Sequence, residues 1–237
     1  LAALAPILYG ATWKHVETVT SPVCGGRTFI LDIPRDWDSG GEFSRLRIES
    51  PGQPEFVLTS KDGWSKHDAD SLRLPPKVKS RFKNLLSSSY LYCIAVPAKT
   101  PRTLLFVIGQ PYDDGPQSLD VIALEQSRPP RAILHENNLR LEDLRDLNSD
   151  GFPEVIGRKA YVEQWGGHYE TYAPYFVYVL TGNADPRKTY SEPLSRTYNL
   201  KNYYGWTDPK SAQDYTVDLR PRAGGRPKVV KRPREDQ

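Results

Sequence analysis

The residues with the clearest chemical potential lie in the segment DLNSDGFPEV, Asp146–Val155. Three of its side chains carry oxygens at alternate positions, and Gly151 permits the tight turn that would fold them around one centre. Calcium prefers six to eight hard oxygen ligands, and clustered carboxylates repel one another when no cation lies between them. The predicted calcium ligands are Asp146, Asn148, Asp150, the carbonyl of Phe152, and Glu154.

The spacing of this segment separates it from a helix–loop–helix calcium site. Its first half matches an EF-hand loop, but the twelfth position is Gly157 rather than Glu, and the loop leads directly into the strand-like Val155-Ile156. The alternative without metal is a polar turn in which Asp and Asn side chains cap the backbone.

A loop D-x-N-x-D-G-x-x-E followed by a strand resembles the calcium loops of FG-GAP repeats, as in integrin α-chain propellers and related exported bacterial proteins. The resemblance extends over Leu141–Leu180 and implies a blade in which the loop joins neighbouring strands and binds calcium. A propeller needs at least four blades, whereas DWDSGGE at Asp36–Glu42 is only a degenerate second loop, with Gly40 in place of the third acid. We therefore expect an antiparallel β-sandwich or partial propeller-like sheets.

Motifs for catalysis are weak by comparison. The four histidines lack zinc spacing, and the sequence contains neither a G-x-S-x-G elbow nor a phosphate-binding loop. Asp113-Asp114 would offer paired carboxylates for glycoside hydrolysis, but PYDDGP is typical of a hairpin turn. A better binding candidate is an aromatic group in a loop-like setting, which would stack on a sugar or anchor a partner unless it fills the core. The predicted ligand-binding residues are Tyr203, Tyr204 and Trp206.

Short alternating, β-branched and aromatic runs separated by Gly, Pro and Asp predict a mainly β chain. One helix is expected at 75–88, where Val78, Phe82 and Leu85 form a single apolar stripe. The predicted strands are Arg27–Ile33, Phe43–Ser50, Glu55–Ser60, Tyr90–Val96, Thr103–Gly109, Leu119–Glu125, Arg131–Glu136, Lys159–Trp165 and Tyr175–Leu180.

The N-terminal segment is apolar, and the cysteines suggest a compartment. The first thirteen residues carry no charge and the chain contains no Met, which predicts a processed or truncated product. Residues 1–21 are read as an N-terminal extension that is a signal remnant, a membrane anchor near the bilayer or an ordinary first strand. In an exported, extracellular or periplasmic protein, Cys24 and Cys93 would form one disulfide; the alternative is two unrelated buried thiols.

Charge is distributed unevenly along the 237 residues, whose net charge is +3. Residues 220–237 hold seven basic and two acidic residues, whereas residues 1–219 hold 25 and 27. We therefore expect a single β domain at 22–217 and a basic Pro/Gly-rich tail at 218–237 that binds a protein subunit rather than nucleic acid. The predicted partner-binding residues are Arg220, Arg222, Arg226, Lys228, Lys231, Arg232 and Arg234.

Together these features predict a non-enzymatic, exported, calcium-binding β protein that serves as a binding module or accessory subunit of a larger assembly. The alternative is a secreted hydrolase or carbohydrate-binding protein that uses the aromatic residues. A cleft with convergent acids would favour the alternative.

Overall fold

Antiparallel strands dominate the fold, and the predicted mainly β architecture is confirmed. The computed structural model describes residues 12–38, 41–64, 91–96, 102–109, 118–125, 128–159, 162–164, 168–181, 185–203, 206–207, 215–218 and 229–231. Two four-stranded sheets are simple meanders. Sheet A contains β1 (Trp13–Ser21), β2 (Arg27–Pro34), β3 (Phe43–Glu49) and β4 (Phe56–Trp64), and sheet B contains β5 (Leu91–Val96), β6 (Arg102–Gly109), β7 (Ser118–Glu125) and β8 (Arg131–Glu136).

Two three-stranded sheets follow. Sheet C has the order β12 (Tyr175–Tyr178), β10 (Glu154–Arg158), β9 (Arg140–Arg145), and sheet D has the order β11 (Tyr169–Thr171), β13 (Tyr215–Asp218), β14 (Val229–Lys231). A short 3-10 helix, η1 (Pro22–Cys24), joins β1 to β2, and α2 (Glu192–Asn202) follows β12. Among the described residues, no helix is long and apolar enough to cross a membrane.

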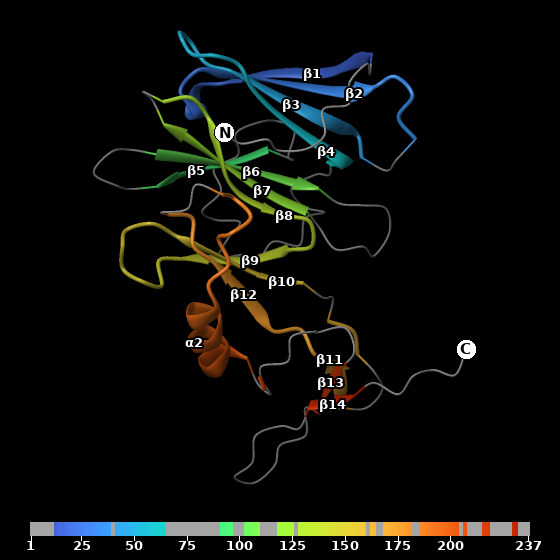
Figure 1. The fold of residues 1–237 in the computed structure, drawn as a ribbon, viewed down its shortest axis with the longest axis vertical. Helices are drawn as coiled ribbons and strands as arrows, with labels where there is room; N and C mark the ends of the chain where they lie inside the picture. The colour runs from blue at the N-terminus through green and yellow to red at the C-terminus, as the bar shows by residue number, and fades with distance from the viewer. Residues whose placement is uncertain are drawn as a thin grey trace.

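Sheets A, B and C are stacked in chain order, and α2 lies against sheet C (Figure 1). Sheet B is the central layer, and the strand period of two sends its residues alternately to both sides. Leu105 and Val107 pack in the core shared with sheet A, whereas Leu104 and Phe106 pack in the core shared with sheet C. This double burial explains why β6 and β7 read as continuous apolar runs.

Helix α2 closes the free edge of sheet C. An edge strand exposes unpaired N–H and C=O groups that invite another chain to pair with it. Here the Ser195 hydroxyl accepts a hydrogen bond from Val177 N (2.9 Å), while the Asn199 side chain accepts from Tyr175 N (2.8 Å) and donates to Tyr175 O (2.7 Å). Two residues one helical turn apart therefore act as a substitute neighbouring strand.

The sequence did not predict strands β9, β11, β13 and β14, and the structure also bears on other predicted elements. Residues 13–21, for which an ordinary first strand was one of three readings, form β1 and pair antiparallel with β2, and Val16 packs on the core. Strand β10 covers the predicted strand start at Val155-Ile156 and ends at Arg158, and among the described residues of the predicted strand Lys159–Trp165 only Gln164 forms a bridge. Helix α2 was not predicted, and the helix expected at 75–88 lies outside the described residues.

Candidate metal-binding loop and polar clusters

The predicted calcium loop connects β9 to β10, two neighbouring antiparallel strands of sheet C. Glu154 pairs with Arg145 at the base of this connection. Gly157, which occupies the EF-hand Glu position, lies within β10, where an added Cβ would come within 2.6 Å of the Leu139 side chain. The loop is thus built into a sheet, as expected from the strand that follows it.

Side-chain oxygens of the predicted ligands fold back onto the loop backbone. Asp146 accepts hydrogen bonds from Asp150 N (3.1 Å) and Gly151 N (3.0 Å), and Asp150 accepts one from Phe152 N (2.7 Å). Asn148 accepts a further bond from Asp150 N (2.9 Å). Left-handed φ angles at Ser149 (62°) and Gly151 (82°) produce the tight curvature. The turn therefore brings the first three predicted ligands onto one short segment.

Glu154 is the buried member of the set, with only 1% of the residue exposed. Its Oε2 accepts a hydrogen bond from Leu147 N (2.6 Å). Burial raises the pKa of this carboxyl, and the negative charges of Asp150 and Asp146 raise it further against the opposing effect of backbone hydrogen bonds. The three acids therefore lie close enough to repel one another.

The donor set fits a hard cation in chemistry, since all five predicted ligands are oxygens and three are carboxylates. Within the described part of the chain, none of these three carboxylates forms an ion pair with a basic side chain. The described residues also contain no group of three Asp, Glu, His or Cys side chains that converge on one metal position. Glu154 instead points toward Leu147 N. Phe152 anchors the loop by burying its ring between sheets B and C.

Cys24 of η1 and Cys93 of β5 form a disulfide, as predicted. Both residues are buried in the core between sheets A and B. Arg27, also buried, donates to Cys24 O (2.9 Å) and Ser50 Oγ (3.0 Å) beside the bridge. The disulfide indicates an oxidising, non-cytosolic compartment.

Of the predicted aromatic ligand-binding residues, Tyr203 and Trp206 are described and Tyr204 is not. Tyr203 follows α2, accepts a hydrogen bond from Ala173 N (2.9 Å), and packs edge-on against the ring of Tyr172 at 5.5 Å. Burial raises the pKa of Tyr203. The Trp206 ring is half-buried, with Arg196 5.8 Å from its centre. Tyr203 is thus part of a packed aromatic cluster.

The basic tail has one described segment, and it is a strand. Val229–Lys231 forms β14, which pairs antiparallel with β13 at the edge of sheet D. Lys231 is the only predicted partner-binding residue within the described residues; the others, like Asp113-Asp114, lie outside them. A strand at this position is compatible with the nearby prolines because an edge strand needs fewer backbone donors.

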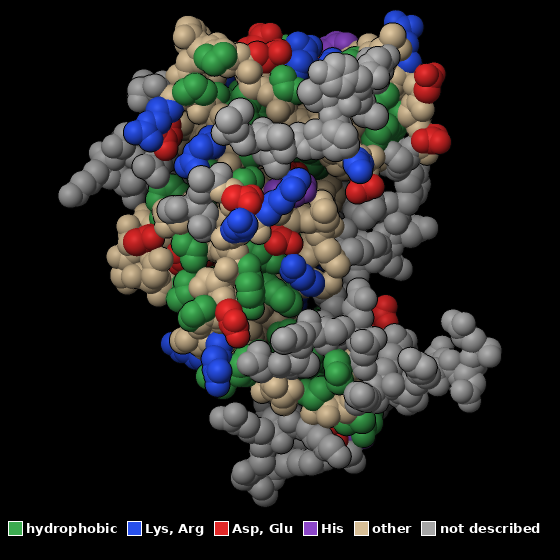
Figure 2. All heavy atoms as spheres, in the orientation of Figure 1, with side chains coloured by type: hydrophobic (Ala, Val, Ile, Leu, Met, Phe, Trp, Pro, Cys, Tyr) green, Lys and Arg blue, Asp and Glu red, His purple; other side chains and the backbone are tan. Residues whose placement is uncertain are grey.

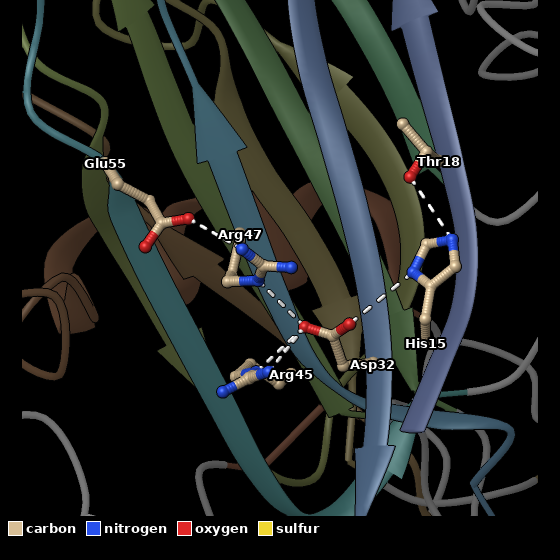
Figure 3. Close-up of polar contacts among 6 residues, drawn as sticks. All are labelled: His15, Thr18, Asp32, Arg45, Arg47 and Glu55. Atoms are coloured by element: carbon tan, nitrogen blue, oxygen red, sulfur yellow. Dashed lines mark hydrogen bonds and ion pairs between the residues drawn. The ribbon is translucent and has the colours of Figure 1, made fainter. Parts of the chain in front are cut away.

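A charge cluster on the outer face of sheet A was not predicted (Figure 3). Asp32 of β2, whose side chain is 3% exposed, accepts hydrogen bonds from Arg45 Nε and Arg47 Nε of β3, both at 2.9 Å. Arg47 also pairs with Glu55 (3.0 Å), and His15 Nδ1 lies 3.6 Å from Asp32. Burial alone would raise the pKa of Asp32, but the two arginines outweigh it and hold that pKa below its usual range.

A second unpredicted cluster links sheets A and B. Asp120 of β7 is buried and accepts hydrogen bonds from Trp64 Nε1 of β4 (3.1 Å) and from His135 Nδ1 of β8 (2.7 Å). The hydrogen bond to Asp120 raises the pKa of His135 above its ordinary value, despite its partial burial and the nearby charge of Arg187. Predicting this cluster would require the register of strands β7 and β8, which the sequence pattern alone does not give.

Charges of both signs are interspersed over the face shown in Figure 2, and no extended area of its described residues carries one sign. Comparison with known protein families, curated proteins and solved structures gave no match to this chain. The resemblance to FG-GAP loops therefore remains a prediction that depends on the loop sequence itself.

Proposed function

We propose that the chain is a non-enzymatic, exported β-sheet module that binds calcium at Asp146–Glu154 and serves as an accessory subunit of a larger assembly. The observation that carries this proposal is the accumulation of three carboxylates in one β9–β10 turn without a described basic partner. Calcium, when bound, would supply the positive charge that offsets their repulsion.

The surroundings of the loop explain how calcium would stabilise the fold. Thr181 donates to Asp150 Oδ2 (3.1 Å), and Leu147 packs against the small core formed by Ile156, Val177 and Tyr198 of α2. Ordering the loop would therefore restrain the segment after β12 and the helix that covers it. A bound cation would also offset the burial and the neighbouring negative charges that raise the pKa of Glu154.

The disulfide and the basic C-terminal residues support a location and a kind of partner for the chain. The disulfide supports an extracellular or periplasmic location. The concentration of seven basic residues in 220–237 supports a protein partner with an acidic surface, bound through electrostatic attraction. Because Val229–Lys231 belongs to sheet D, we assign the docking role to side chains on either side of β14 rather than to a wholly separate tail.

A thermal melt with and without calcium tests the metal site. Ligand at about 100 times its Kd stabilises a protein by about 2.7 kcal/mol. For a chain of this size, about 2–4 °C per kcal/mol converts this to a rise of roughly 5–11 °C in Tm. Asp150→Ala should remove that rise.

The matched control is Asp185→Asn, because Asp185 caps Arg187 N (3.0 Å) in a turn outside the loop. This variant should keep the full calcium response. A wild-type melt that calcium leaves unchanged would contradict the metal proposal.

The docking role needs a change that spares β14. Arg232→Glu combined with Arg234→Glu reverses two charges without removing a strand, whereas deleting residues 220–237 would also remove β14. We expect the double variant to keep the wild-type melting temperature and to lose salt-sensitive co-purification with its native partner. Unchanged co-purification would refute the docking role.

A further inference from the structure

Arg158 occupies an unusual position at the end of β10, on the face of sheet C that α2 covers. It lies directly opposite Tyr175 of β12, and its guanidinium carbon is 4.2 Å from the centre of the Tyr175 ring. The ring of Tyr203, which follows α2, lies 5.7 Å from the same carbon. Arg158 Nη2 donates a hydrogen bond to Tyr175 Oη. The cation is therefore held against two tyrosines.

The charge of Arg158 has no carboxylate partner within the described ranges of the chain. Other half-buried arginines differ, since Arg45 and Arg47 pair with Asp32. Arg27, which also has no carboxylate partner among the described residues, donates to Cys24 O, Ser50 Oγ and Glu125 O. Arg158 uses one donor on a tyrosine, and its Nε is buried with no acceptor. Its terminal nitrogens thus retain free hydrogen-bonding capacity.

The tyrosines around Arg158 are fixed in place by the surrounding structure. Asn199 of α2 holds both backbone polar groups of Tyr175, and Ala173 N holds the Tyr203 hydroxyl. The rings of Tyr175 and Tyr203 are 6.1 Å apart and nearly perpendicular. Because Tyr175 Oη already accepts from Arg158, its own proton is free to be donated elsewhere. The cluster thus combines a cation, a hydroxyl donor and aromatic surface.

We propose that Arg158, Tyr175 and Tyr203 form a binding site for a small sugar acid. The ligand carboxylate would accept hydrogen bonds from the terminal nitrogens of Arg158 and from the Tyr175 hydroxyl, since guanidinium and carboxylate match in geometry. The enclosed Nε directs the approach to the terminal nitrogens. The sugar ring would then lie against the exposed part of Tyr203.

The charges at the site favour a carboxylate over a phosphate. Among the described residues, the arginine directly opposite Arg158 in β9, Arg140, already pairs with Glu142, and Arg145 at the other end of β9 pairs with Asp143. A phosphate dianion would remain half-neutralised there, whereas a carboxylate matches one guanidinium. The site is independent of the calcium loop, because Glu154 and Arg158 lie at opposite ends of β10.

Calorimetric titration of the full chain with glucuronate, acetate and glucose tests the proposal. Glucuronate offers both the carboxylate and the ring, while acetate and glucose each offer one of them. We expect glucuronate to bind at least about tenfold more tightly than either, and Arg158→Gln to weaken it by at least about tenfold, as loss of a charge-assisted hydrogen bond does. Arg128→Gln, whose guanidinium pairs with Glu125 of sheet B, should leave binding unchanged.

Two further measurements keep the result interpretable. Tyr175→Phe removes only the hydroxyl, so it should weaken glucuronate binding even if Arg158→Gln fails to fold, and melting curves establish which variants are folded. No saturable glucuronate binding to the wild type would overturn the proposal. Equal binding of acetate and glucuronate, or equal binding to wild type and a folded Arg158→Gln, would also overturn it.

Discussion

Replacing Asp32 with asparagine removes the negative charge at the centre of the outer face of sheet A and preserves the size of the side chain. Asp32 is 3% exposed and accepts 2.9 Å hydrogen bonds from Arg45 and Arg47. Removing one partner of a buried ion pair costs about 3–5 kcal/mol. The two arginine side chains are 21% and 27% exposed, so water offsets part of the loss. We expect Asp32→Asn to lower the free energy of unfolding by about 2–3 kcal/mol.

Glu55→Gln is the matched control, because Glu55 pairs with the same Arg47 but is 40% exposed. Exposed ion pairs contribute about 0–1 kcal/mol, so this variant should lie close to the wild type. Urea unfolding at pH 7 gives both free energies from the midpoint and slope of the transition. Equal destabilisation by the two substitutions would refute the argument that burial makes Asp32 important.

The pH dependence of stability gives Asp32 a second signature. Its pKa in the folded state is lowered by the arginines, so its contribution to stability is present above the unfolded value of about 3.9 and is lost as the pH falls through the folded value. Asp32→Asn should therefore reduce the loss of stability that the wild type shows on acidification below about pH 4. An acid-unfolding curve as steep in the variant as in the wild type would contradict this assignment.

Three further predictions concern the contacts between layers. The raised pKa of His135 means that its stabilising contribution is full below about pH 6.5 and disappears as the pH rises through the folded value, so His135→Gln should flatten the stability profile above about pH 6.5. Ser195→Ala with Asn199→Ala leaves Tyr175 N, Tyr175 O and Val177 N at the β12 edge without their side-chain partners, and sedimentation should show new self-association; an unchanged sedimentation profile would contradict this. Cys24→Ser with Cys93→Ser should cost about 4 kcal/mol in urea unfolding on the chain-entropy estimate, whereas a reduced wild type as stable as the oxidised form would contradict it.

Local patterns predicted most of the central strands correctly. In β2, β6 and β7 the apolar residues are dense enough to mark a strand whichever faces are buried, and the observed bounds differ from the predicted ones by one residue or less. The turn between β9 and β10 was located for a similar reason, and its calcium binding stays a prediction. Its Asp, Asn and Gly residues determine a tight turn through short-range hydrogen bonds, which depend little on the rest of the fold.

Helices and strands whose stability depends on residues far away in the sequence were harder to predict. The apolar stripe of α2 is short, and its buried polar residues Ser195 and Asn199 are explained only by the edge of β12, which no local pattern reveals. The N-cap Ser191 and the Pro193 that follows it were the available signal. Strand β1 was one of three readings left open, because an uncharged N-terminal segment is equally typical of a signal remnant or an anchor.

The polar clusters required strand register. Asp32 meets Arg45 because the two residues are directly opposite in the β2–β3 pairing, and Asp120 meets His135 because they are opposite in the β7–β8 pairing. A shift of one residue would place either side chain on the other face of its sheet. The sequence supplies the residue types, and only the paired strands bring them together.

Calorimetric titration of chelator-stripped protein with calcium measures the central claim directly. The account predicts a saturable isotherm with one calcium ion per chain, and its loss when Asp146 and Asp150 are both replaced by alanine. The isotherm should persist in Asp185→Asn, whose carboxylate lies outside the loop. A wild-type titration with no saturable heat, or an isotherm that the double replacement leaves intact, would contradict calcium binding at this loop.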